Sequence, residues 1–237
     1  MKDLITLILV LCLFSYEKEE KTSIDNDYFL IGTLSDNMGR QKFKKVEERV
    51  DQYFPSEKQI CLTIDSIFNN KYSDLEFSSS LNESSKKEIY ELHSKKLAKK
   101  IDAFYSYEAF GGMAYIGEED ITKLNLDSLT KTKDFYSTNF DTIYTGKLKL
   151  NLFKTDKQKE SFITGAYARY GWQSDSLYHI KIYNSNSKMR ILNELLKDIG
   201  CTNVNYEIKK NIPTVHTVSF IPTEKLEDYF EKYKNLE

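Results

Sequence analysis

From residue 147 onward the chain changes several times between two spacings of its apolar residues, and this limits the possible folds more than any other feature. Apolar residues at alternate positions are typical of strands, and apolar residues three or four positions apart are typical of helices. Strands are predicted at 148–152, 178–182, 204–208 and within 214–221. Helices are predicted at 156–170, 187–199 and 223–234. The resulting order, β-α-β-α-β-β-α, predicts an α+β fold in which helices layer against a mixed β-sheet.

The preceding half of the chain shows mainly helical patterns. Apolar residues at helical spacing predict a helix at 40–54 and another at 86–108. Between them, a capping pattern at Ser56 predicts the start of a third helix. Tyr28–Leu34 reads as a short strand, and a strand is the alternative after Ser56, because Ile60, Leu62 and Ile64 alternate. Residues 113–146 have no clean period. With 9 Gly and 3 Pro in 237 residues, a turn-dense all-β sandwich is excluded. We therefore expect a mostly helical N-terminal half, and no internal repeat is evident.

These patterns divide the chain into four segments. Residues 1–16 resemble a signal peptide, and 17–35 read as a tether that ends in the short apolar run. Residues 36–146 form the mainly helical region, and 147–237 form the α+β region.

The first segment carries an apolar run, Leu4–Phe14, after a charged start at Lys2. The run is too short to cross a bilayer as a helix and has the length of the apolar part of a secretory signal. Cys12 could accept a lipid anchor, although Leu11 stands where such signals have a small residue. The alternative is that the run forms part of the core of an intracellular protein. We expect an exported protein that lies in the periplasm, is tethered to a membrane of the cell envelope or is extracellular. The mature chain should have no transmembrane helix.

The cysteines and histidines give no metal-binding pattern. Cys61 and Cys201 could form one disulfide in an oxidising compartment, or they could remain two buried thiols. The chain has no CxxC pair, no HExxH motif and no Cys/His cluster with zinc spacing. We therefore expect no metal site.

Composition and motifs also argue against nucleotides, nucleic acids and catalysis. The formal net charge is -2, whereas nucleic-acid binders usually carry a basic excess. Neither GxGxxG nor GxxxxGK[ST] occurs, so no cofactor is expected. Two pairs that could support nucleophilic catalysis, Cys201 with His216 and Ser176 with His179, lack any supporting motif. No catalytic residue is assigned.

One face of the predicted sheet is the best candidate for binding. Along 177–183, His179, Lys181 and Tyr183 share one side, while the other side is apolar and faces the helices. We expect these three residues, with His216 on a neighbouring strand, to hold an anionic or hydroxyl-rich ligand or a partner protein. The alternative is that the N-terminal helices cover this face.

These observations together favour a non-catalytic binding module of the cell envelope, of the immunity or accessory type. Its partner would be an unidentified protein or small molecule, and not a nucleic acid. An envelope hydrolase that uses His179 or His216 is the alternative, and an intracellular protein is a third interpretation.

Overall fold

The structure of the chain is a computed structural model that describes residues 23–36, 39–43, 48–82, 86–115 and 140–233. The apolar run with Cys12 and the end of the chain beyond residue 233 lie outside these ranges.

The chain contains the same order of elements twice, α-β-β-α-β-β-α, with a β-hairpin between the two copies. The first copy consists of α2 (Asn26–Thr33), β1 (Arg40–Phe43), β2 (Arg49–Tyr53), α3 (Lys58–Phe68), β3 (Glu76–Leu81), β4 (Glu88–His93) and α4 (Lys95–Asp102), with a short 3-10 helix, η1 (Pro55–Glu57), before α3. The hairpin consists of β5 (Tyr105–Tyr115) and β6 (Phe140–Leu148), and η3 (Leu150–Leu152) follows it. The second copy consists of α7 (Asp156–Tyr170), β7 (Gly171–Ser174), β8 (Leu177–Tyr183), α8 (Asn186–Asp198), β9 (Thr202–Lys209), β10 (Val215–Ile221) and α9 (Glu224–Tyr233). The expectation of no internal repeat is therefore wrong at the level of the fold.

The strands of the two copies are also ordered alike. Three sheets form, with orders β1-β6-β5, β2-β4-β3 and β7-β8-β10-β9. The order β2-β4-β3 of the first copy corresponds to β8-β10-β9 of the second. Every strand pair in the described parts of the chain is antiparallel. The expected mixed sheet with parallel neighbours is therefore wrong, because β10 lies between β8 and β9, the two strands that α8 connects, and pairs with each of them in the antiparallel direction.

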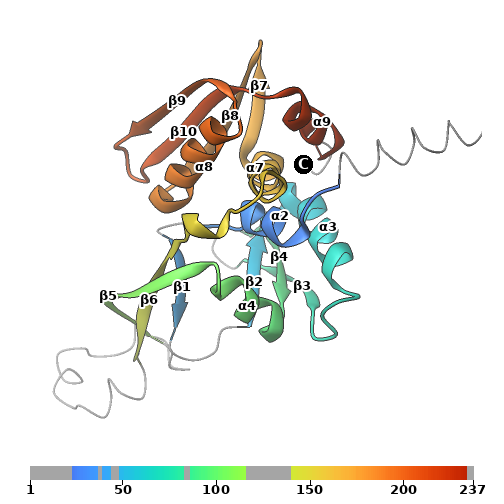
Figure 1. Ribbon diagram of the computed structural model, residues 1–237. Coiled ribbons are helices and arrows are strands. Elements are labelled where there is room, and N and C mark those ends of the chain that lie inside the picture. Colours follow the sequence, from blue (N-terminus) through green and yellow to red (C-terminus); the bar gives the residue numbers. More distant parts are fainter. Residues whose placement is uncertain (1–22, 37–38, 44–47, 83–85, 116–139, 234–237) are drawn as a thin grey trace, which may run out of the picture.

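Helices α2 and α7 pack against each other at the centre of the molecule, between the sheets (Figure 1). A methyl group on Gly32 would lie 2.2 Å from the carbonyl oxygen of Phe162, and one on Gly165 would lie 2.1 Å from that of Phe29. Each of these carbonyls belongs to the residue three positions before the glycine of its own helix. This reciprocal contact is what an approximate two-fold axis between the two copies produces.

The second copy packs its helices on one face of its sheet. The apolar side of β8 and β10 is buried, with Ile180, Val218 and Phe220 fully inaccessible to solvent. Leu192 of α8 and Leu226 of α9 are equally buried in the same core. The opposite face of this sheet carries the polar residues of β8, as alternation requires.

The N-terminal half is not mostly helical, which contradicts the expected fold class. The segment 40–54 forms β1 and β2, and a bulge between Arg49 and Asp51 buries two successive residues, Val50 and Asp51. The bulge shifts the alternation, and the apolar positions therefore mimic helical spacing. The segment 86–108 divides into β4, α4 and the start of β5, because the Ser94 hydroxyl accepts a hydrogen bond from the Leu97 amide and begins a new helix.

Conversely, the apolar run at 28–34 belongs to helix α2 and not to a strand. The Asp25 carboxylate caps this helix by accepting a bond from the Asp27 amide. The helix after Ser56 and the three C-terminal helices are confirmed, with small shifts at their ends. Of the expected C-terminal strands, 148–152 is replaced by the end of β6 and by η3.

Candidate functional site

The outer face of the C-terminal sheet gathers aromatic and cationic side chains. The Trp172 ring stacks on His179 with centroids 4.8 Å apart and an angle of 13° between the planes. The Lys181 ammonium lies 5.4 Å from the centre of the Trp172 ring and 5.8 Å from that of Tyr183. Cation–π attraction at such distances holds a lysine in place while it keeps its charge available.

Strand pairing explains why these residues meet. Trp172 of β7 and Ser219 of β10 both stand opposite His179 of β8. The ring nitrogens of His179 lie 2.8 Å from the hydroxyls of Ser174 and Ser219, one on each neighbouring strand. These contacts fix the imidazole across three strands.

The face continues onto β9, where polar side chains dominate. Thr217 pairs with Lys181 on one side and with Glu207 on the other, and Asn205 pairs with Ser219. We call the surface formed by Trp172, His179, Lys181, Tyr183, Thr217, Ser219, Asn205 and Glu207 the open face. Its aromatic members are accessible, since Trp172 is 40% exposed and Tyr183 is 46% exposed.

The structure brings together three of the four residues proposed from the sequence. His179, Lys181 and Tyr183 lie on the open face, but His216 lies on the covered side of the sheet and is only 4% exposed. Its Nδ1 atom lies 2.7 Å from the Tyr206 hydroxyl, and burial lowers its pKa. Sequence reasoning missed Trp172. The available signal was its place directly after Gly171, where α7 ends and β7 begins.

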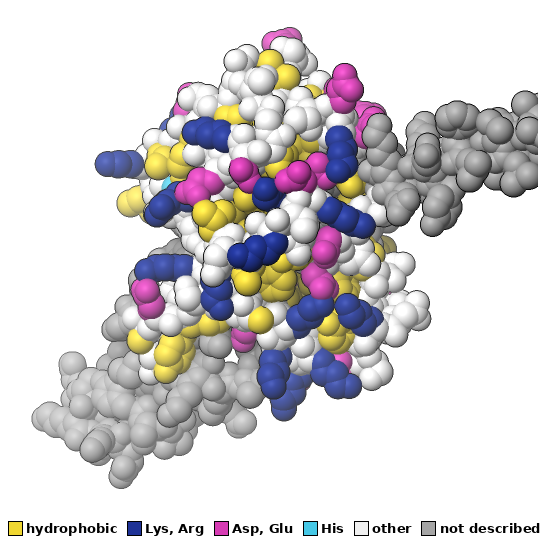
Figure 2. Space-filling view, in the orientation of Figure 1, with side chains coloured by type: hydrophobic (Ala, Val, Ile, Leu, Met, Phe, Trp, Pro, Cys, Tyr) yellow, Lys and Arg dark blue, Asp and Glu magenta, His cyan; other side chains and the backbone are white. Residues whose placement is uncertain are grey.

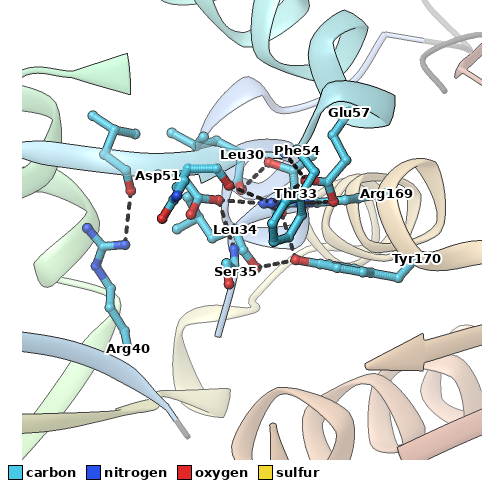
Figure 3. A network of polar contacts seen from close by, with 12 residues as sticks. Leu30, Thr33, Leu34, Ser35, Arg40, Asp51, Phe54, Glu57, Arg169 and Tyr170 are labelled. Atoms are coloured by element: carbon cyan, nitrogen blue, oxygen red, sulfur yellow. Dashed lines mark hydrogen bonds and ion pairs between the residues drawn. The ribbon is translucent and has the colours of Figure 1, made fainter. Parts of the chain in front are cut away.

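A second group of polar residues lies where α2 and α7 end, and Arg169 is at its centre (Figure 3). The Arg169 guanidinium donates to the carboxylates of Asp51 and Glu57 at 2.6–3.0 Å. It also donates to the carbonyl oxygens of Thr33 and Gln52, at 2.8 and 2.7 Å. All five N–H donors of the arginine are thus used, and its side chain is only 2% exposed.

Beside this network lies a second buried pair, Asp36 and Lys188. Lys188 is fully buried, and its ammonium donates to the Leu34 carbonyl at 2.6 Å. The Ser185 hydroxyl donates to Asp36 at 3.1 Å. Burial raises the pKa of Asp36 to about 6 and lowers that of Lys188 to about 7, although each charge stabilises the other.

This second group does not suit a metal ion. Its carboxylates already accept hydrogen bonds from Arg169 and Ser185, and the cations of Arg169 and Lys188 lie in the same group. Among the described residues, no three His, Cys, Asp or Glu side chains lie close enough to hold a metal. Cys61 and Cys201 are free, buried thiols, so they do not form the disulfide considered above.

A cleft of about 930 Å³ separates β6 from α8 and the β9–β10 turn. Figure 2 shows this hollow between the β5–β6 hairpin and the second copy, with Lys and Arg side chains on both margins. Its cations are Lys147, Arg190 and Lys210. Lys147 is paired with Glu108 at 2.6 Å.

Comparison with known proteins identifies the fold. No protein-family model and no curated protein match this sequence. A crystal structure of I-DmoI in complex with DNA and Mn superposes with a TM-score of 0.50 and 10% identity, over 89% of this chain and 96% of that chain. Mesophilic variants of the homing endonuclease I-DmoI give 0.48 and 12%, over 90% and 97%. The N-terminal LAGLIDADG domain of DUF199/WhiA gives 0.42 and 11%, over 93% and 90%. The fold thus resembles that of the LAGLIDADG homing endonuclease.

This likeness contradicts our interpretation of the chain as an exported binding module of the cell envelope, without a nucleic-acid partner. The fold resembles that of I-DmoI, whose crystal structure contains DNA, and it gives no support to a periplasmic, lipid-anchored or extracellular role. The alternative of an envelope hydrolase that uses His179 or His216 fails for the same reason. None of the helices in the described part of the chain combines the length and the apolar character needed to cross a bilayer.

Proposed function

We propose that this protein binds duplex DNA and that the open face forms a large part of the contact surface. The fold supports this, because the similar I-DmoI structure contains DNA. The observation that carries the proposal is the arrangement of Trp172, His179, Lys181 and Tyr183 on a sheet face that no other described element covers.

The chemistry of the open face suits a nucleic acid. The Lys181 ammonium can neutralise a phosphate, and the hydroxyls of Thr217 and Ser219 can donate to phosphate oxygens. Asn205 offers an amide that can form two bonds with the edge of adenine in the major groove. A two-stranded β-ribbon such as β9–β10 has dimensions that the major groove accepts.

The near-neutral net charge is compatible with this proposal because the cations are unevenly placed. Lys147, Arg190 and Lys210 border the cleft between the two halves. Only Glu194 among the residues that line the cleft is acidic. The cleft lies on the other side of β9 and β10, where His216 and Ile208 are, so its cations would meet a duplex that passes from the open face around the β9–β10 turn.

The proposal is tested by measuring DNA affinity against monovalent salt for the protein and for Lys181→Ala. Loss of one phosphate contact should weaken binding to all sequences and reduce the slope of log K against log salt by about one. Lys99→Ala is the matched control, because Lys99 is an exposed lysine on α4 in the other half.

Equal effects of the two substitutions would contradict the assignment of the open face. Absence of DNA binding at low salt would contradict the function itself. Tighter binding to an RNA hairpin than to duplex DNA would contradict the choice of DNA.

A further inference from the structure

We infer that this protein binds DNA without the help of a divalent metal ion and leaves the DNA uncut. The inference rests on the function proposed above and concerns the group of charged residues where α2 and α7 end. The similar I-DmoI structures contain Mn or Ca together with DNA. The corresponding question here is whether the carboxylates of this chain could hold such an ion.

The first argument is that the carboxylates beside Arg169 are already neutralised. Asp51 accepts from Arg169 at 2.6 Å and from the Ser35 amide at 2.8 Å through the same oxygen. Glu57 receives two bonds from Arg169, at 2.8 and 3.0 Å, and a third from the Phe54 amide at 2.8 Å. A divalent ion would have to displace a fully bonded guanidinium or bind beside its charge.

The second argument comes from the approximate symmetry of the two copies. Gly32 and Gly165 occupy corresponding places where the helices cross. Four residues further along, the first copy has Asp36 and the second has Arg169. An arrangement that could supply one carboxylate from each copy therefore supplies one carboxylate and one guanidinium, and the positive charge of the guanidinium opposes the binding of a cation between them.

The third argument is that Asp36 itself cannot act as an exposed ligand. It is 2% exposed, the buried Lys188 ammonium stabilises its charge, and only its Oδ1 atom is left without a hydrogen-bond partner. A hard divalent cation needs several oxygen ligands and retains waters, for which this enclosed site offers few partners. A metal-activated water for strand scission would have no position among these residues.

The experiment compares DNA affinity in EDTA and in excess Mn²⁺ or Mg²⁺ at matched ionic strength. We expect equal affinity in all conditions and no nicking of a supercoiled plasmid. In parallel, the melting temperature of the DNA-free protein is measured with and without Mn²⁺. An ion that binds only the folded state raises the melting temperature, so we expect no increase.

A metal-dependent gain in affinity, a nicked plasmid or an increase in melting temperature with Mn²⁺ would overturn the inference. Asp51→Asn tests one of these carboxylates directly. We expect this substitution to lower the melting temperature by the same amount in EDTA and in Mn²⁺, because it removes a partner of Arg169 and no metal ligand. Glu91→Gln, which affects an exposed pair with Arg49, is the matched control. If the protein binds no DNA in any condition, the proposed function fails, while the Mn²⁺ melting experiment still decides whether these carboxylates hold a metal ion.

Discussion

Two buried ionisable residues, Asp36 and Lys188, lie at the junction of the two halves of the molecule. Asp36 stands just after α2 of the first half, and Lys188 lies on α8 of the second. Each has lost most of its contact with water, and this loss shifts the pKa of each toward the neutral form. Such a pair gives less stability than its charges suggest, because the desolvation of two ions offsets their attraction.

The direction of the two pKa shifts predicts the pH at which the pair contributes least to the stability of the folded protein. The pKa of Asp36 is raised to about 6, so its contribution is complete below its unfolded value and is lost as the pH rises through 6. The pKa of Lys188 is lowered to about 7, so its contribution is complete above its unfolded value and is lost as the pH falls through 7. Both contributions are therefore smallest between about pH 6 and 7.

We expect the double variant Asp36→Asn with Lys188→Met to gain stability relative to the wild type most strongly in this interval. The gain should shrink toward pH 4, where Asp36 of the wild type is protonated and neutral, and toward pH 10, where Lys188 is deprotonated and neutral. Urea unfolding at several pH values measures this difference. Lys197→Met, an exposed lysine on the same helix, should show no such dependence. A difference that does not change with pH would show that the pair is not shifted.

At the scale of elements, the packing of α2 on α7 depends on two glycines. Glycine within a helix normally costs about 0.5–1 kcal/mol relative to alanine, so a substitution by alanine usually stabilises. At Gly165 a methyl group would lie 2.1 Å from the Phe29 carbonyl oxygen and 3.2 Å from the Cα of Gly32. These are backbone atoms, so the helices themselves would have to separate.

We therefore expect Gly165→Ala to lower the free energy of unfolding by about 1–3 kcal/mol, as overpacking does. Ser66→Ala, at an exposed position of α3, is the control for intrinsic helix propensity and should change little. Chemical denaturation monitored by circular dichroism measures both. Stabilisation by Gly165→Ala would show that the helices lie further apart than described.

The same elements show how far the sequence predicts this fold. The helices α7, α8 and α9 were predictable because each has its apolar residues on one side or a capping pair, such as Thr155 with Gln158. Helix α2 was not, because Tyr28 to Thr33 are all buried and an apolar run without a polar side gives no period. The repeat was visible only as two short similar stretches, Phe29 to Gly32 and Phe162 to Gly165.

The candidate site, like the fold, was predictable only in part. Alternation along β8 placed His179, Lys181 and Tyr183 together, because the side-chain period of a strand depends on local geometry alone. It could not place His216, because the register between β8 and β10 sets which residues share a face, and His216 pairs with the buried Ile182. The Arg169 network was beyond prediction, since its partners lie more than 110 positions away in the chain.

At the scale of the whole molecule, Arg169 connects the two halves. It belongs to α7 of the second half, but its five hydrogen bonds all go to the first half, to α2, β2 and η1. Its guanidinium also lies 4.6 Å from the centre of the Tyr53 ring in the first half. Because each half has its own sheet and helices, such contacts decide whether the halves unfold together.

We expect Arg169→Met to lower the free energy of unfolding by about 3–5 kcal/mol, because it leaves the buried Asp51 and the half-buried Glu57 without their partner. The loss should also separate the unfolding of the two halves. Trp172 is the only tryptophan and reports the second half, whereas circular dichroism reports both. The two signals should coincide in the wild type and in Arg49→Met, whose ion pair with Glu91 lies within the first half, and should diverge in Arg169→Met. Coincident transitions with a small change in stability would mean that the paired helices alone hold the halves together.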